Sequence, residues 1–346
     1  MTRPMIGLVI STGLLAVAAP ALAGPVTIAY DVPSLDRWMY PFNPTPGVRG
    51  SSSVFGAIDQ PDFDNRDGQM LVGFDTAADI TPGLGADAYT VVSVRLLLET
   101  AENETFVYDD SHDSYRVLLD PADPEYLEDA DDGQPLELFG VGYRNGLTRM
   151  SFQETTPYAF GDPIGQGVRN AYAFGAPAGE TLGDVSLSVQ ERFDPVPWAI
   201  GTIDGVAPGA LVPLGTTVVF DLDVTNPAVH AYLTESLDDG RLGFAVTCLV
   251  PAAPMEGAFP FFYNRENTLV SLGLANPAAL EIVVEVSAGD CFEDLDGSGD
   301  VGFSDLLTVL ATWGACPAEC PADLDDSGDV GFTDLIAVLA AWGVCP

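Results

Sequence analysis

Two nearly identical segments end the chain, and they constrain its fold more than any other feature. Residues 294–317 read DLDGSGDVGFSDLLTVLATWGACP, and residues 323–346 read DLDDSGDVGFTDLIAVLAAWGVCP. Six of the 24 aligned positions differ, and the second copy starts 29 residues after the first. A segment repeated so closely is one structural unit used twice. We therefore expect two copies of one small unit that pack against each other.

Each copy has the residues of a calcium-binding loop. A calcium ion takes about six to eight oxygen ligands, which a turn presents from alternate residues. Loop positions 1, 3, 5, 7 and 12 carry these oxygens, with the position 7 residue offering its backbone carbonyl. In the first copy they are Asp294, Asp296, Ser298, Asp300 and Asp305, and in the second Asp323, Asp325, Ser327, Asp329 and Asp334. Gly299 and Gly328 stand at position 6, where the loop turns sharply. We predict two bound Ca²⁺ ions.

The alternative to metal binding is an Asp-Gly turn without an ion, but two loops in register favour the metal. Each loop has about three carboxylates and a short aspartate at position 12, which predicts modest affinity, as in extracellular calcium modules. Val301 and Val330 at position 8 are apolar, as expected where two such loops pair. Twelve acids and no base in this segment predict that it loosens without calcium.

A short amphipathic helix is expected after each loop. Ser304 and Thr333 are suitable N-caps, and Gly314 and Gly343 are suitable C-terminal stops. Large apolar residues recur at helical spacing, and we expect them in the core because two short helices need each other's apolar faces. They are Phe303, Leu306, Leu307, Leu310 and Trp313 in the first copy, and Phe332, Leu335, Ile336, Leu339 and Trp342 in the second.

A calcium loop followed by a single helix, given twice, resembles the dockerin family. The Trp-Gly-x-Cys-Pro ending of both copies is similar to the GC-type dockerins of planctomycete-like bacteria. The resemblance covers residues 290–346 and implies a docking module that attaches the protein to a cohesin-like or other surface receptor. Gly302 and Gly331 at position 9 depart from cellulosomal dockerins, where Asn is usual, and this puts a conventional cohesin partner in doubt.

Four of the five cysteines lie in the same segment, which favours two disulfides in an oxidising compartment. A bridge within one copy must span a helix of about ten residues, roughly 15 Å long. That exceeds the Cα separation of about 4.4–6.8 Å that a disulfide allows. If the copies pack antiparallel about a pseudo-twofold axis, the pairs become Cys316–Cys320 and Cys291–Cys345. Cys248 stands alone in an apolar, strand-like run, where a buried free thiol is expected.

The first 23 residues have the pattern of a signal peptide. Arg3 precedes an apolar run, residues 5–19. The small-x-small cleavage signature Ala21-Leu22-Ala23 follows it, and we expect cleavage after Ala23. That run is shorter than the roughly 20 residues of a spanning helix, and no later stretch is long enough. We expect a secreted protein, extracellular or at a cell surface. The 51 acids and 12 arginines give a net charge of −39, which repels nucleic acid and anionic membranes. The chain has no lysine, and this excludes lysine Schiff-base chemistry.

Residues 24–287 read as a large β domain, and residues 288–346 as the small calcium-binding one. Strands are expected in seven runs, at residues 26–30, 69–75, 89–99, 184–190, 217–223, 241–248 and 280–286. Apolar side chains recur at every second position in Val92, Val94, Leu96 and Leu98, and again in Val185, Leu187 and Val189, as in a strand with one buried face. One short helix is expected at residues 227–237. Many strands with turn-rich connections predict an antiparallel, jelly-roll-type β-sandwich.

The large domain is similar to the DNRLRE-type domains, carbohydrate-binding-module-like sandwiches of secreted bacterial proteins. The similar segments are DRWMYP (36–41), QMLVGFD (69–75), VVSVRLLL (91–98), RLGFAV (241–246) and FYNREN (262–267). The likeness spans most of residues 24–286, although the hexapeptide that names the family is absent. It implies binding of a glycan or a cell surface rather than catalysis.

No catalytic constellation stands out. Two histidines, His112 and His230, are too few for a three-histidine zinc site, and no G-x-S-x-G elbow exists, although a Ser–His–Asp set stays open. The acidic run 109–132 is expected to be a solvated loop rather than a further calcium site. Trp38, Tyr40, Phe42 and Trp198 are expected in the core rather than against sugar rings.

The sequence thus predicts a non-catalytic protein with a calcium-dependent tether and a polysaccharide as a second partner. A dockerin-bearing polysaccharide-degrading enzyme and a structural surface component are the alternatives.

Overall fold

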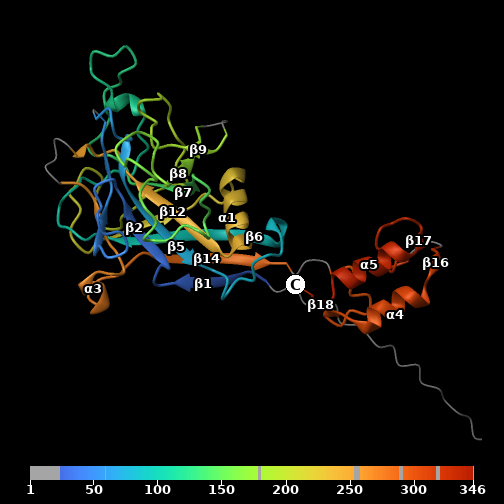
Figure 1. Ribbon diagram of the computed structural model, residues 1–346. Coiled ribbons are helices and arrows are strands. Elements are labelled where there is room, and N and C mark those ends of the chain that lie inside the picture. The colour runs from blue at the N-terminus through green and yellow to red at the C-terminus, as the bar shows by residue number, and fades with distance from the viewer. Residues whose placement is uncertain are drawn as a thin grey trace, which may run out of the picture.

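Antiparallel sheets dominate the computed structural model, which describes residues 24–58, 60–177, 181–252, 258–287, 291–316 and 320–345 (Figure 1). The four-stranded sheet has the order β1 (Val26–Tyr30), β14 (Ala279–Val286), β6 (Tyr89–Glu99) and β11 (Thr217–Asp221). The eight-stranded sheet has the order β2 (Leu35–Met39), β5 (Arg66–Asp75), β12 (Arg241–Thr247), β7 (Glu137–Tyr143), β8 (Ala171–Gly175) and β9 (Gly183–Asp184), with β4 (Phe55–Gly56) on β5 and β10 (Ala199–Ile200) on β7. A separate ribbon joins β3 (Ser51–Ser53) to β13 (Phe261–Tyr263).

Among the described residues before 288, helices are few and short. They are η1 (Ala86–Ala88), η2 (Tyr115–Leu118), α1 (Pro227–Asp239) and α3 (Thr268–Ser271). The expected helix at residues 227–237 is α1, which starts at an Asn226 cap and ends at Gly240 in the left-handed region. It packs on β12 and β6, and the Tyr232 hydroxyl donates to the Gly243 carbonyl at 2.8 Å. The mainly β, antiparallel class predicted from the sequence is confirmed.

One apolar cluster contains inward-facing residues of both large sheets. The four-stranded sheet contributes Leu96 and Ile282 among others, and the eight-stranded sheet contributes Val72 and Phe244. A second cluster lies on the other face of the eight-stranded sheet, where Phe152 and Tyr158 cover it. Strands β5 and β12 are therefore buried on both faces.

Three fully buried arginines fix irregular segments to the eight-stranded sheet. Arg169 Nε lies 2.6 Å from Asp64 Oδ2, and Arg66 pairs with Glu137 and donates to Ser188 Oγ at 2.6 Å. Arg37 donates to two carbonyls of the 150s segment. Because burying an unpaired charge is expensive, each of these contacts ties a loop to one position.

Two of the expected strand features are wrong. Residues 185–190 turn after the two-residue strand β9, so Val185, Leu187 and Val189 do not form a ladder. In β6 a bulge opposite the step from Val283 to Val284 leaves Val92 exposed, while Val94 faces the core. A bulge inserts one residue and reverses which face its neighbours occupy.

The C-terminal segment is a separate cluster of short elements. Its order is β15 (Asp300–Val301), α4 (Phe303–Ala311), β16 (Gly314–Ala315), β17 (Asp329–Val330), α5 (Phe332–Ala340) and β18 (Gly343–Val344). Helices α4 and α5 pack together around the small side chains Val309 and Val338.

The expected signal peptide, residues 1–23, lies outside the described residues. Among the residues that are described, no helix has the length and apolarity needed to cross a membrane.

Candidate metal centres

The first loop gathers its carboxylates at one point. One oxygen each of Asp294, Asp296 and Asp305 lies within 4.8 Å of the other two. Backbone groups fix two of them: Ser298 N–H donates to Asp294 Oδ1 at 3.0 Å, and Asp296 N–H donates to Asp305 Oδ1 at 3.1 Å. Ser298 Oγ donates to the Asp300 carbonyl at 3.1 Å, which brings the oxygens of positions 5 and 7 together.

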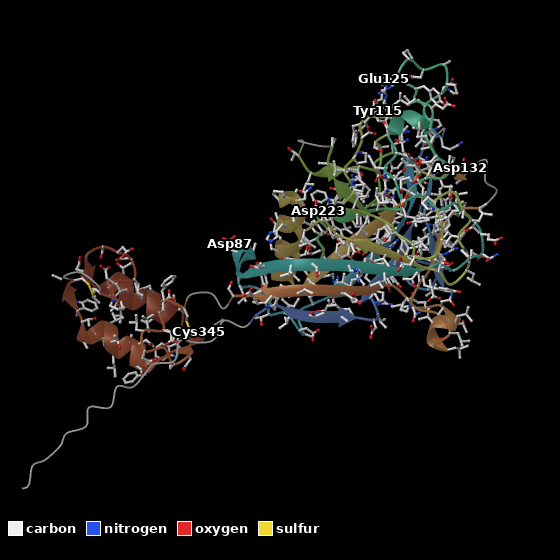
Figure 2. The ribbon with its side chains drawn as sticks, turned by 180° about the vertical axis from the view of Figure 1, so that it is seen from behind. Asp87, Tyr115, Glu125, Asp132, Asp223 and Cys345 are labelled. Carbon is white, nitrogen blue, oxygen red and sulfur yellow. A yellow bond between two sulfur atoms is a disulfide. The ribbon has the colours of Figure 1, made fainter. Side chains whose placement is uncertain are left out.

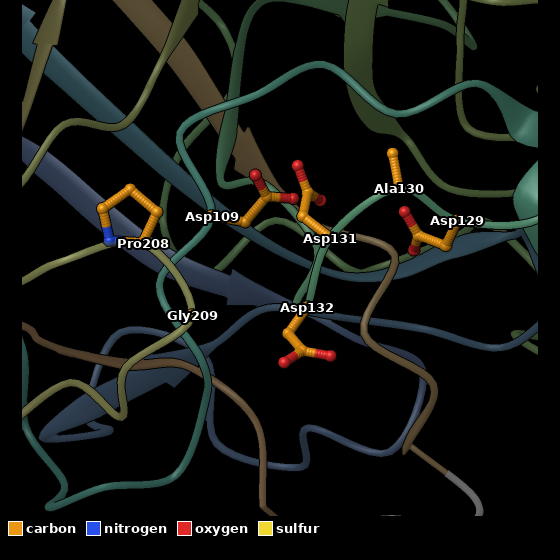
Figure 3. A pocket seen from close by; sticks show the side chains of 7 residues that line it. All are labelled: Asp109, Asp129, Ala130, Asp131, Asp132, Pro208 and Gly209. Carbon is orange, nitrogen blue, oxygen red and sulfur yellow. The ribbon is translucent and has the colours of Figure 1, made fainter.

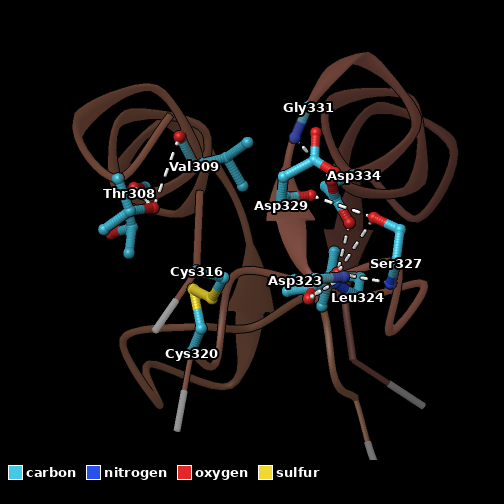
Figure 4. The surroundings of a disulfide bond; sticks show 12 residues. Thr308, Val309, Cys316, Cys320, Asp323, Leu324, Ser327, Asp329, Gly331 and Asp334 are labelled. Atoms are coloured by element: carbon cyan, nitrogen blue, oxygen red, sulfur yellow. Dashed lines mark hydrogen bonds between the residues drawn. A yellow bond between two sulfur atoms is a disulfide. The ribbon is translucent and has the colours of Figure 1, made fainter. Parts of the chain in front are cut away.

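The second loop repeats this geometry (Figure 4). Asp323, Asp325 and Asp334 converge within the same 4.8 Å. Ser327 Oγ donates to the Asp329 carbonyl at 3.0 Å. In each loop three of the five residues named as ligands from the sequence bring their carboxylates together, and the serine at position 5 contacts the carbonyl at position 7. This donor set fits a hard divalent cation such as calcium, which would neutralise the carboxylates and organise the loop.

The closing aspartates are the most constrained members of the clusters. Asp305 and Asp334 are buried, with 0% and 1% of their surface exposed. Each also accepts from the backbone N–H that precedes its helix, Gly302 and Gly331 respectively, at 2.7 Å. Although desolvation raises the pKa of Asp334, the N–H groups of Gly331, Leu324 and Asp325 outweigh it and lower that pKa overall. The structure therefore holds a buried carboxylate at each helix start.

The helix boundaries differ from those expected. Gly302 and Gly331 are the N-caps, so Ser304 and Thr333 lie inside the first turn. The aspartate at the third helical position accepts from the N-cap N–H, which replaces a serine or threonine cap. The helices end at Ala311 and Ala340, and their C-caps, Thr312 and Ala341, stand two residues before Gly314 and Gly343.

The two loops do not pair with each other. Val301 pairs with Gly343 and Val330 with Gly314, so each loop pairs with the strand that follows the other copy's helix. This exchange is what an antiparallel, pseudo-twofold arrangement produces. Both valines are buried beneath the helices, which corrects the expectation that they join loop to loop.

The cysteines form the two pairs named from the pseudo-twofold argument. Cys291 joins Cys345 and Cys316 joins Cys320, with Cα separations of 5.8 and 5.9 Å. The Cys291–Cys345 bridge links the start of the first copy to the end of the second. The Cys316–Cys320 bridge, drawn in Figure 4, links the end of the first copy to the start of the second. Cys248 is a buried free thiol, and burial raises its pKa to about 12.

Most of the large apolar residues of α4 and α5 are exposed, contrary to expectation. Only Leu306 and Leu335 of the ten predicted core residues pack on the cluster, whose centre is formed by smaller side chains. The exposed ones are Phe303, Leu307, Leu310 and Trp313 in the first copy and Phe332, Ile336, Leu339 and Trp342 in the second. Two helices of nine residues bury one narrow stripe each, so the outer faces stay uncovered.

The acidic run 109–132 is not a simple solvated loop. Asp109 is 4% exposed, and one oxygen each of Asp109, Asp113 and Asp131 lies within 4.8 Å of the others. Burial, followed by the charges of Asp109, Asp129 and Asp131, raises the pKa of Asp113 to about 7. The only sequence feature that could have indicated this cluster is the high density of acids at both ends of the run.

A fourth acidic group surrounds an arginine. Asp36, Glu154 and Glu266 lie close together, with Arg265 Nε 2.8 Å from Glu266 and Nη2 2.5 Å from Glu154. The Arg265 N–H donates to Asp36 Oδ2 at 2.7 Å. Two segments of the DNRLRE-type resemblance, 36–41 and 262–267, therefore meet here. Sequence alone could not include Glu154.

The aromatic residues divide between core and surface. Trp38 and Trp198 are buried as expected. Tyr40 stacks on Trp38, with ring centroids 4.5 Å apart, and meets Phe42 at 5.4 Å. Phe42 is exposed, so the expectation that it lies in the core is wrong.

No protein-family model matches the chain, and no curated protein matches it.

Proposed function

We propose that the chain is a secreted, non-catalytic attachment protein. A calcium-binding, dockerin-like tail tethers a jelly-roll-type, carbohydrate-binding sandwich to a receptor on a cell surface or extracellular scaffold. The observation that carries the attachment role is the pair of exposed apolar faces on α4 and α5. Contiguous exposed apolar surface is typical of a protein-interaction site.

The two faces are equivalent by sequence and by position. Each consists of a phenylalanine at the helix start, two aliphatic residues one turn apart, and a tryptophan after the helix end. Phe303 and Trp313 are 65% and 49% exposed, and their counterparts Phe332 and Trp342 are 68% and 50% exposed. Large aromatic and aliphatic side chains are the usual anchors of protein interfaces.

Calcium controls whether these faces exist. Asp305 and Asp334 start the helices and also belong to the carboxylate clusters, so metal binding and helix formation share one residue in each copy. Three converging carboxylates per loop repel one another without a cation. Tethering is therefore calcium-dependent in this proposal.

The charge of the tail defines its partner's chemistry. Residues 288–346 contain 12 acids and no base. A receptor that buries the apolar faces must contact this acidic rim, and opposite charge there favours association. We propose a receptor protein with an apolar patch bordered by arginine and lysine.

Sedimentation of the full chain with envelopes of the cells that produce it tests the tether. Binding is expected in millimolar calcium, with release by a chelator. Replacing Leu307 and Ile336 by aspartate should abolish binding, because a charge on each face opposes burial. Val92→Asp is the control, since Val92 is an equally exposed apolar residue on the sandwich.

Two results would contradict the tether. Binding that persists in chelator removes the calcium dependence. Equal loss from Val92→Asp and from the double variant makes the effect one of charge rather than of a docking face.

The glycan-binding part of the proposal rests on Phe42, which is exposed and lies in an aromatic series between Tyr40 and Phe63. Exposed aromatic rings can stack on sugar rings. Depletion of the full chain by insoluble polysaccharides, scored for bound protein and released sugar, tests this role. Phe42→Ala should lower binding, whereas Phe160→Ala, a comparably exposed phenylalanine, should not. Release of sugar would instead support an enzyme.

A further inference from the structure

The acidic run 109–132 leaves the sandwich and returns to nearly the same point. Figure 2 shows Tyr115 and Glu125 at the tip of this projecting segment, with Asp132 nearer the sheets. At its base, Gly133 has φ 123° and approaches so closely that a Cβ there would lie 3.0 Å from the Asp109 Cβ. The two ends of the run are therefore in contact.

This contact brings carboxylates from both ends together. Asp109 and Asp113 come from the outgoing part of the segment and Asp131 from the returning part, with one oxygen of each within 4.8 Å of the others. Figure 3 shows the Asp109 and Asp131 carboxylates beside each other, while Asp132 points elsewhere. The site opens into a cavity of about 420 Å³, which Asp129 also lines.

One buried oxygen of this cluster and one of the adjacent Gln134 have no hydrogen-bond donor among the residues that the structure describes. Asp109 Oδ1 accepts from Ser111 N–H at 2.8 Å and from Ser111 Oγ at 2.9 Å, whereas Asp109 Oδ2 has no donor among the described residues. Gln134 is 7% exposed, and its Oε1 likewise has no donor there. Its Nε2 donates to Asp113 Oδ2 at 2.8 Å, so the amide belongs to the cluster. Buried polar atoms are nearly always satisfied, and a cation satisfies an oxygen.

No arginine neutralises this cluster. Among the described residues, none of Asp109, Asp113, Asp129 and Asp131 is ion-paired with an arginine. The Asp36–Glu154–Glu266 group is different, because Arg265 occupies its centre. The one nearby histidine, His112, lies 3.8 Å from Glu137.

We propose that the sandwich holds a third calcium site, formed by Asp109, Asp113 and Asp131 with Gln134 beside them. The 4.8 Å limit between oxygens suits an ion about 2.4 Å from each, the usual calcium–oxygen distance. All contributing atoms are hard oxygens or their amide neighbour, which favours calcium over zinc or copper. The site closes the base of the 109–132 segment.

The proposal stands on these contacts alone and is independent of the tether. It is tested in the full chain carrying Asp305→Asn and Asp334→Asn, which disable the tail loops. Calorimetric titration with calcium should give three equivalents for the unaltered chain and one for this background. Calcium should also raise the unfolding temperature of the sandwich in the background, because an ion that binds only the native state stabilises it.

Adding Asp131→Asn to the background should weaken the remaining site at least about tenfold, since ligand charge sets calcium affinity. Asp131 is exposed, so folding is not at risk, and far-UV circular dichroism verifies it. Asp110→Asn, an exposed neighbour outside the cluster, makes the same charge change and should leave affinity unaltered.

Absence of calcium binding by the background at millimolar concentration would overturn the third site. Unchanged affinity in Asp131→Asn, or equal weakening in Asp110→Asn, would overturn it as well. An unaltered chain that binds a single equivalent, with that equivalent weakened by Asp131→Asn, would contradict only the tail centres.

Discussion

The two disulfides of the tail should contribute unequally to its stability, because they close chain segments of very different length. Cys291 and Cys345 are 54 residues apart, and Cys316 and Cys320 are four apart. We compare two double variants: Cys291→Ser with Cys345→Ser, and Cys316→Ser with Cys320→Ser. Each removes one bridge and leaves the other.

The expected difference follows from the entropy of the unfolded chain. A bridge that closes 54 residues restricts that chain by about 14 cal/mol/K, or about 4 kcal/mol at 25 °C. A bridge that closes four residues restricts it by about 6 cal/mol/K, or about 2 kcal/mol. The hydrophobic core of a domain as small as the tail supplies only about 3–5 kcal/mol of stability. Loss of the long bridge should therefore unfold the calcium-free tail.

Hydrogen exchange of the full chain, followed by mass spectrometry, measures the opening free energy of α4 and α5 separately from that of the antiparallel sheets. In calcium, the helices should lose about 4 kcal/mol of protection without the long bridge and about 2 kcal/mol without the short one. Strand β12 is the internal control and should not change. Equal losses, or a larger loss from the short bridge, would refute the reasoning that loop length decides the contribution.

Three further outcomes are expected. Asp326 has a left-handed backbone, with φ 53°, and the equivalent residue of the first copy is Gly297, with φ 69°. In chemical denaturation, Asp326→Gly should stabilise the tail by about 0.5 kcal/mol, and Gly297→Asp should destabilise it. In chelator, the lowered pKa values of Asp294 and Asp334 stabilise the folded tail; this stabilisation is complete above pH 3.8 and is lost as the pH falls through the folded pKa. In an acid titration followed by circular dichroism, the loss of helix signal with falling pH should be shallower in Asp334→Asn. Cys248 should react with a thiol reagent only after denaturation, at one equivalent per chain.

The two helices of the tail, the convergence of its loop aspartates and its cysteine pairs could be predicted from sequence, but its helix caps, its strand pairing and what its helices bury could not. The aspartates of each loop converge through local chemistry, since all of them belong to that loop. The spacing of Leu307 and Trp313 indicates an apolar stripe, but not that another element covers it. Two nine-residue helices provide too little surface to cover residues as large as these, and Val309 and Val338 fill the space between them instead.

In the large β region, the positions of most strands were predictable, but which residues each strand buries was less so. Strands β1 and β6 have the expected bounds because their apolar runs are long and bounded by turns. The bulge at Val92 depends on how β14 pairs with β6, which no local pattern records. The burial of β5 on both faces depends on the distant Phe152 and Tyr158.

Whether an acidic cluster can be predicted from sequence also depends on how far apart its residues lie along the chain. Asp294 and Asp305 belong to one loop of fixed spacing, so their convergence can be inferred from residue numbers alone. Asp109 and Asp131 flank a projecting segment, and they meet only because Gly133 permits close contact of its two ends. A net charge of −39 therefore says little by itself. What matters is whether an arginine or a cation compensates each place where the fold concentrates that charge.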